Sequence, residues 1–287
     1  SQRPLDLTQL SLLISETCKD LSEVKHELIL QETLRNLYDG MPILEIDKAL
    51  IISARTLVEQ DPNYTYATAR FLLRTLYTEA LDFLELPTAV YTNNHAGVYH
   101  HYFQHYIKRG VALELLDPQL RSFDLEKLGK ALLPERDQQF TYLSLQTLYD
   151  RYFLHADDVR FELPQAFFMR IAMGLAQQES NKEDRAIEFY QLLSSFDYMA
   201  STPTLFNAGT LRPQLSSCFL TTVADDLDQI YSAIKDNALL SKFAGGLGND
   251  WTPVRAMGAR IKGTNGKSLG VVPFLNVANA SAVAVNQ

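Results

Sequence analysis

The most informative stretch of this chain reads STPTLFNAGTLRPQLSSCFL, from Ser201 to Leu220. Small hydroxyl side chains surround Pro203, and a turn ending at Gly209 follows them. Such hydroxyl groups can donate hydrogen bonds to phosphate oxygens. A pair of serines then leads into Cys218 at the start of a predicted strand. The thiol of Cys218 has two interpretations at this stage, as a reactive group or as a small hydrophobic side chain packed in a core.

The residues around this stretch predict an α/β layer. From about residue 189 onward, short β-favouring pieces such as residues 217–220 alternate with helical patterns such as residues 227–242, and glycine becomes frequent. In such a layer the loops at strand ends carry the chemistry.

The first part of the chain predicts a small helical bundle. Apolar residues recur at helical spacing from residue 7 to about residue 83, and loops at 39–42 and 61–63 separate the segments. Thr8 and Thr65 are expected at N-caps or in first turns.

The middle of the chain, residues 84–178, is rich in Tyr, Phe and His and predicts little strand. Helices are expected around residues 99–108, 142–152 and 163–175. His101 and His105 would share one helix face, but zinc requires further ligands that this segment lacks. A packed His/Tyr-rich helix is therefore favoured, and no metal site is predicted.

Composition excludes several classes of protein. The 287 residues are 46% apolar and carry a formal charge of −8, which argues against global disorder and against a protein that coats duplex nucleic acid. No apolar run approaches the roughly 20 residues that span a bilayer, and no signal peptide is evident. The two cysteines, Cys18 and Cys218, form no disulfide framework, which favours a reducing, cytoplasmic location. Both ends of the sequence are expected to be internal positions of a longer polypeptide.

Two glycine-rich segments have alternative interpretations. Residues 243–248 follow a predicted helix and suit either a C-cap with a tight turn or the close approach of backbone to a ligand. Residues 263–268 resemble the end of a P-loop, but Ile261 stands where that motif requires its first glycine. A plain turn or an anion-holding loop remains there.

Separate blocks of the sequence, in the same order, closely resemble the catalytic large subunit of class I ribonucleotide reductases. The blocks are residues 201–209, 213–220, 225–226, 230–231, 241–242, 244–248, 255–258, 263–266 and 272–274. Upstream, residues 39–40 and 61–70 look like the helical part of that family's ATP-cone and its connection to the next domain.

The resemblance implies an α/β fold with a helical N-terminal region, followed by the first part of a ten-stranded α/β barrel. It implies three parts: residues 1–85 as an ATP-cone-like region, residues 86–197 as the helical domain, and residues 198–287 as the start of the barrel. The basic hairpin that opens a typical ATP-cone is missing, so this cone is expected to be degenerate.

The resemblance also implies a catalytic and substrate site. Cys218 matches the cysteine that helps to reduce the ribose 2′ carbon and becomes half of an active-site disulfide, a role that requires a reversibly oxidised thiol. The implied substrate-binding residues are Ser201, Thr202, Thr204, Ser217 and Gly246. Cys18 is the only other cysteine, so the chain alone is expected to be inactive.

An allosteric specificity site is implied as well. Asp226 matches a residue that contacts the effector ribose, and Arg255 matches a basic residue that faces the effector phosphates, roles that suit a carboxylate and a guanidinium. Leu227 and Lys242 complete the expected effector-binding set. The effectors would be dNTPs and ATP, and no cofactor is expected in this chain itself.

The implied partners are those of the family. They are a complementary C-terminal part of the large subunit, a metal-containing small subunit that generates the radical, thioredoxin or glutaredoxin as reductant, and a second copy that pairs through the helix at 227–242. The substrate is a ribonucleotide; neither nucleic acid nor membrane is expected as a partner. Two alternatives stay open at this stage: a catalytically inactive nucleotide-binding regulatory module of a reductase complex, and a structural helical adaptor.

Overall fold

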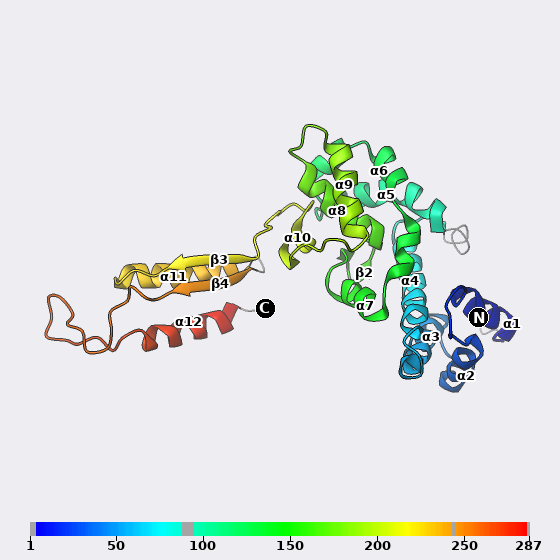
Figure 1. Ribbon diagram of the computed structural model, residues 1–287, viewed down its shortest axis with the longest axis horizontal. Coiled ribbons are helices and arrows are strands. Elements are labelled where there is room, and N and C mark those ends of the chain that lie inside the picture. The colour runs from blue at the N-terminus through cyan, green and yellow to red at the C-terminus, as the bar shows by residue number, and fades with distance from the viewer. Residues whose placement is uncertain (1–3, 88–94, 243–244, 286–287) are drawn as a thin grey trace. The chain divides into compact units, whose positions relative to one another are not determined.

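The computed structural model describes residues 4–87, 95–242 and 245–285. The chain divides into two compact units. We call them the helical unit, residues 1–199 with 209–211, and the α/β unit, residues 200–208 with 212–287. Figure 1 shows their elements. The further division of the helical part at residue 85 stays a prediction.

The helical unit begins with three helices and a longer fourth. The first and third helices pack on the fourth, and the second packs on the first and third. They are α1 (Leu7–Thr17), α2 (His26–Asn36), α3 (Ile43–Thr56) and α4 (Tyr64–Phe83), with a short 3₁₀ turn η1 (Leu57–Glu59) before α4. Asp6 caps α1 by accepting hydrogen bonds from the backbone N–H groups of Thr8 and Gln9 at 3.0 and 3.1 Å. Thr8 and Thr65 therefore lie in first turns, as predicted. The core of this part includes Leu10, Ile14, Cys18, Ile29, Leu50 and Phe71.

The rest of the helical unit contains α8, a deeply buried helix that packs against α5, η3 and α9. The elements are α5 (His95–Ala112), η2 (Pro118–Ser122), α6 (Leu125–Ala131), η3 (Pro134–Gln139), α7 (Tyr142–Arg151), β1 (His155–Ala156), β2 (Val159–Arg160), α8 (Pro164–Ala176) and α9 (Lys182–Ser194). Every residue of α8 from Pro164 to Met173 is buried, which follows from its nearly continuous apolar sequence. The predicted helices here are confirmed, and α5 is longer than expected.

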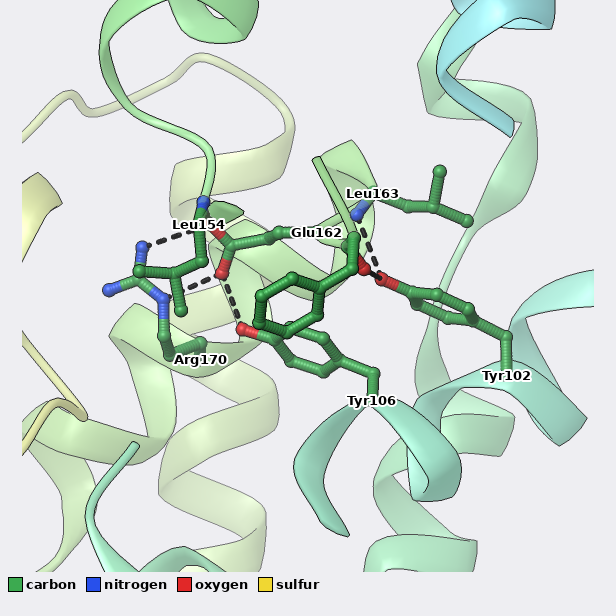
Figure 2. A network of polar contacts seen from close by, with 7 residues as sticks. Tyr102, Tyr106, Leu154, Glu162, Leu163 and Arg170 are labelled. Carbon is green, nitrogen blue, oxygen red and sulfur yellow. Dashed lines mark hydrogen bonds and ion pairs between the residues drawn. The ribbon is translucent and has the colours of Figure 1, made fainter. Parts of the chain in front are cut away.

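A buried polar network ties α5 and α8 to the loop before α8 (Figure 2). Glu162 accepts hydrogen bonds from the Tyr106 hydroxyl, from Nε of Arg170 at 2.7 Å and from the backbone N–H of Leu154 at 2.9 Å. The Glu162 and Arg170 side chains are both fully buried. The Tyr102 hydroxyl in turn accepts from the backbone N–H of Leu163 at 2.9 Å. Because each charge has an opposite partner and further hydrogen bonds, this pair is tolerated in the interior.

The α/β unit contains a parallel strand–helix–strand arrangement. Its elements are α10 (Thr202–Asn207), β3 (Cys218–Thr222), α11 (Leu227–Ser241), β4 (Gly246–Asp250) and α12 (Val272–Val285). β3 and β4 pair in parallel from Cys218 opposite Gly246 to Thr222 opposite Asp250. α11 connects the two strands and packs against β4 and α12 (Figure 1). Its buried residues Ile230, Ala233 and Ile234 form a core with Val223, which Trp251 and Phe274 flank.

One segment differs from its prediction. Residues 246–250 form a strand, whereas the sequence suggested a helix cap with a tight turn over residues 243–248. Residues 243–244 lie outside the described ranges, and the alternative, a close approach of this backbone to a ligand, stays a prediction. Glycine weakens the strand pattern in the sequence, but here it makes room for β3 side chains: a Cβ on Gly248 would lie 2.8 Å from Leu220 Cδ2.

No helix in the described ranges combines the length and the hydrophobicity needed to cross a membrane.

Candidate functional site

Cys218 lies at the first position of β3 and is exposed, with a free thiol. Gly246 pairs with it on β4 and donates its backbone N–H to the carbonyl oxygen of Ser217 at 2.7 Å. A Cβ on Gly246 would lie 3.5 Å from the Cys218 Sγ atom. Cys218 is therefore not packed in a core of the described residues, because it is exposed.

The other cysteine has the opposite environment. Cys18 is buried among the apolar residues of α1–α4, and burial raises the pKa of its thiol to about 11, although Arg70 opposes the shift. A thiol with so high a pKa is almost entirely protonated near neutral pH, so it is a poor nucleophile. Of the two cysteines, Cys218 is the exposed one.

The hydroxyl residues of the 201–204 segment lie at the start of α10. Ser201 precedes the helix, Pro203 occupies its first turn, and Ser201 and Thr202 are exposed. Proline is favoured there because the first helical N–H groups have no partner within the helix.

Two side chains hold α10 next to the segment that leads into Cys218. The Thr204 hydroxyl donates to the carbonyl oxygen of Leu215 at 3.4 Å, and Nδ2 of Asn207 donates to that of Gln214 at 2.8 Å. α10, which carries Thr202 and Thr204, therefore lies next to the segment that leads into Cys218.

The predicted effector residues on α11 lie at its two opposite ends. Asp226 is the N-cap of α11, and its Oδ1 accepts from the backbone N–H groups of Asp228 and Gln229 at 3.1 and 3.2 Å. Leu227, the first residue of the helix, is 62% exposed. Lys242 caps the opposite end and is exposed. The structure thus separates Lys242 from Asp226 by the whole length of α11.

Arg255 is already paired in the structure. Its Nε lies 2.9 Å from both carboxylate oxygens of Asp225, and its backbone N–H donates to the same carboxylate at 3.1 Å. These hydrogen bonds hold the pKa of Asp225 below its usual range. Asp225 is a residue that sequence reasoning left without a role, although it stands beside Asp226. It fixes the guanidinium of Arg255 near the N-terminus of α11.

α11 presents a divided apolar surface. Ile230 and Ile234 are buried inside the α/β unit, whereas Leu227, Tyr231 and Leu239 are exposed. The face that the sequence predicted to pair with a second copy also included Ile230, Ile234 and Leu240. The two isoleucines are used by the internal core, and the pairing itself stays a prediction.

The segment at 263–268 forms an exposed turn. Arg260 and Lys267 form an antiparallel bridge at its base, and the backbone N–H of Ile261 donates to the carbonyl oxygen of Gly266 at 3.1 Å. Gly263 has a φ of +79°, which glycine adopts without strain. The plain-turn interpretation accounts for every contact that we observe there.

His101 and His105 lie one turn apart on α5. Nδ1 of His105 lies 2.9 Å from the carbonyl oxygen of His101, one turn earlier on the same helix. Among the described residues, no three His, Cys, Asp or Glu side chains lie together as metal ligands would.

Two family models match consecutive parts of the chain. Residues 138–213 match a model described as ribonucleotide reductase, all-alpha domain, and residues 216–287 match one described as ribonucleotide reductase, barrel domain. The predicted order of a helical region followed by the first part of a barrel is thereby confirmed.

Several known proteins are similar over nearly the whole chain. A ribonucleoside-diphosphate reductase subunit alpha from Chlamydia muridarum is 48% identical over 282 residues, which is 98% of this chain and 26% of that protein. One from Helicobacter pylori is 38% identical over 288 residues, 99% of this chain and 35% of that protein. A ribonucleoside-diphosphate reductase large subunit from Monkeypox virus is 34% identical over 263 residues, 90% of this chain and 32% of that protein. The chain thus spans about a quarter to a third of these relatives.

Proposed function

This chain belongs to the family of ribonucleotide reductase large subunits, and from that membership we propose that it contributes a redox-active cysteine to the reduction of ribonucleotides. The observation that carries the proposal is the exposed, free thiol of Cys218 at the start of β3, beside the backbone of Gly246. The remaining barrel, supplied by further large-subunit sequence, would complete the site.

The proposed chemistry is a two-electron reduction at the ribose 2′ carbon. Two thiols become a disulfide, the 2′-hydroxyl leaves as water, and a hydrogen takes its place, so atoms and electrons balance. Cys218 is one of the two thiols. The second thiol lies outside this chain's site, because Cys18 is packed in the core of the helical unit.

The hydroxyls of Ser201, Thr202, Thr204 and Ser217 would hold the ribonucleotide, and Gly246 would let the substrate approach the thiol. Ser201, Thr202 and Ser217 are exposed, and Thr204 is tied by its hydroxyl to the segment before Cys218. A phosphate or ribose oxygen could accept hydrogen bonds from such groups.

We propose the start of α11 as part of an effector site for dNTPs or ATP. Asp226 and Leu227 lie at this end, and Asp225 orients Arg255 near it. The exposed residues Leu227, Tyr231 and Leu239 support pairing with a second copy through α11. A radical-generating, metal-containing small subunit and a thioredoxin or glutaredoxin belong to the same proposal.

Co-expression of this chain with the remainder of a large subunit, together with a small subunit, tests the catalytic role. We expect effector-dependent ribonucleotide reduction, and we expect Cys218→Ser to abolish multiple turnover. Cys18→Ala is the matched control, since it removes the other thiol and keeps a small apolar side chain; it should retain turnover. Full turnover by Cys218→Ser would refute the assigned role, and inactivity of the assembled wild type would favour the regulatory-module alternative.

The effector site is tested by nucleotide binding to Asp226 variants. Asp226→Ser keeps a good N-cap and removes the carboxylate, whereas Asp226→Ala removes both. If Asp226 contacts the effector, both variants lose nucleotide binding. If Asp226 is only a helix cap, Asp226→Ser binds nucleotide as the wild type does.

A further inference from the structure

Gly209 lies at a position where a side chain would collide with its neighbours, so only glycine fits there. Its φ is +75°, and a Cβ there would lie 2.7 Å from the carbonyl oxygen of Arg170 and 2.9 Å from the Arg170 Cγ atom. It would also meet Cδ1 of Leu120 at 3.4 Å. Arg170 and Leu120 are fully buried, so neither can move aside easily.

Backbone hydrogen bonds hold the same loop tip. The backbone N–H of Asp117 donates to the carbonyl oxygen of Gly209 at 3.0 Å, and Thr210 forms an antiparallel bridge with the buried Leu116. Residues 209–211 accordingly belong to the helical unit, whereas the residues on both sides of them belong to the α/β unit.

The base of this loop carries the proposed substrate site. Asn207 and Thr204 of α10 bond to the carbonyl oxygens of Gln214 and Leu215 across the loop. Gly209 lies between α10 and the segment that leads into Ser217, so its conformation affects both ends of the loop that these hydrogen bonds close.

We propose that Gly209 is a positioning residue for ribonucleotide binding. Its close packing against Arg170 fixes the conformation of the loop, and the loop places the Ser201–Thr204 hydroxyls relative to Ser217. The substrate in this inference rests on the proposed function. Cys218 depends less on the loop, because five paired positions with β4 fix β3 separately. A disturbed loop should therefore weaken substrate binding more than it slows the chemical step.

The test compares Gly209→Ala with Gly40→Ala. Gly40 has a φ of +85° and nothing within 4 Å of a built Cβ, so its variant carries the backbone strain of alanine at positive φ without a collision. In the assembled enzyme we expect Gly209→Ala to raise KM for the ribonucleotide at least tenfold, with a fall in kcat of less than threefold. An unchanged KM, or a fall in kcat as large as the rise in KM, would overturn the proposal.

Hydrogen exchange of the full chain separates this inference from the proposed function. Gly209→Ala should accelerate exchange at least tenfold at the Asp117 amide and across residues 200–217, and Gly40→Ala should leave both unchanged. If the wild-type assembly does not reduce ribonucleotides, the proposed function fails. The exchange data still test whether Gly209 holds the loop at residues 200–217 in place. Equal exchange in both variants would refute it.

A second variant keeps the proposal testable if Gly209→Ala does not fold. Asn207→Ala removes the bond to Gln214 and adds no atoms, so the helical unit should keep its thermal midpoint. Like Gly209→Ala, it should raise the KM for the ribonucleotide. A wild-type KM in this variant would show that the loop base does not position the substrate.

Discussion

Cys218 and Gly246 stand opposite each other in the parallel pair of β3 and β4, and a Cβ at Gly246 would approach the Cys218 Sγ atom to 3.5 Å. The thiol is thus held on a strand rather than on a loop, beside a position that carries no side chain. A strand limits the directions in which the thiol can point, and the glycine leaves room for a reacting group next to it.

The two thiols should differ sharply in reactivity. With its pKa raised to about 11 from 9.0, Cys18 has roughly 100-fold less thiolate at pH 7 than an unperturbed thiol, and burial further limits access. We expect iodoacetamide to modify Cys218 at least 100 times faster than Cys18, as measured by peptide mass spectrometry. In denaturant the two rates should converge, which is the internal control. Comparable rates in the folded chain would contradict the burial of Cys18.

The glycines around β4 should respond differently to alanine. Gly246→Ala places its Cβ at ordinary contact distance from Cys218, so stability should change by less than about 0.5 kcal/mol while alkylation of Cys218 slows severalfold. Gly245→Ala places its Cβ in collision with Cε2 of Phe219 and should cost about 1–2 kcal/mol, because the ring must move. Urea unfolding of both variants checks the contrast, and equal losses of stability would contradict the described register.

Hydrophobic spacing predicted the helices well, because an amphipathic or fully apolar helix repeats over many residues. α8 and α11 lie within one or two residues of their expected ends. β4 was not predicted as a strand, since glycine carries no β-favouring side chain and its role became visible only beside Phe219 and Leu220.

The site shows the same limit. Residue matching predicted roles for Asp226 and Arg255, which stay predictions. It could not show that the carboxylate of Asp225 holds the Arg255 guanidinium, because that contact joins residues 30 positions apart. The close packing of Gly209 against Arg170 could not be predicted either, because a glycine that ends a turn in the sequence gives no sign of the buried carbonyl group it contacts. Local pattern indicates which residues bear chemistry, and tertiary packing determines what each of them contacts.

Asp137 should make the helical unit less stable as the pH rises. The carboxylate is buried and accepts hydrogen bonds from Tyr77, Tyr99 and Gln165 at 2.6, 2.8 and 2.7 Å. Burial raises its pKa from 3.8 to about 6, although these hydrogen bonds oppose the shift. The native state therefore binds the proton more tightly than the unfolded state does. The stabilisation is fully present below pH 3.8 and is lost as the pH rises past 6, by about 3 kcal/mol in all.

The measurement for Asp137 is the difference in unfolding free energy between pH 4.5 and pH 7.5. The side chain in Asp137→Asn cannot ionise, so this difference should be smaller in the variant. Subtracting the variant's difference in unfolding free energy from that of the wild type removes the contributions of the other titrating groups. The asparagine opposes one donor of Gln165, so some loss of stability at pH 4.5 is expected as well. An identical pH dependence in both proteins would contradict a raised pKa at Asp137.

The buried pair of Glu162 and Arg170 should show strong coupling. Arg170→Met leaves the Glu162 carboxylate buried with only the Tyr106 hydroxyl and the Leu154 N–H among its observed donors, and we expect it to cost about 3–5 kcal/mol. Glu162→Gln should cost a similar amount, because it leaves the guanidinium without its counter-charge. The double variant removes both charges, so it should be more stable than the sum of the single losses predicts, with a coupling free energy of at least about 2 kcal/mol. Urea unfolding of the four proteins at neutral pH measures this coupling. Additive losses would mean that water or other groups compensate each charge separately, which the full burial of both side chains argues against.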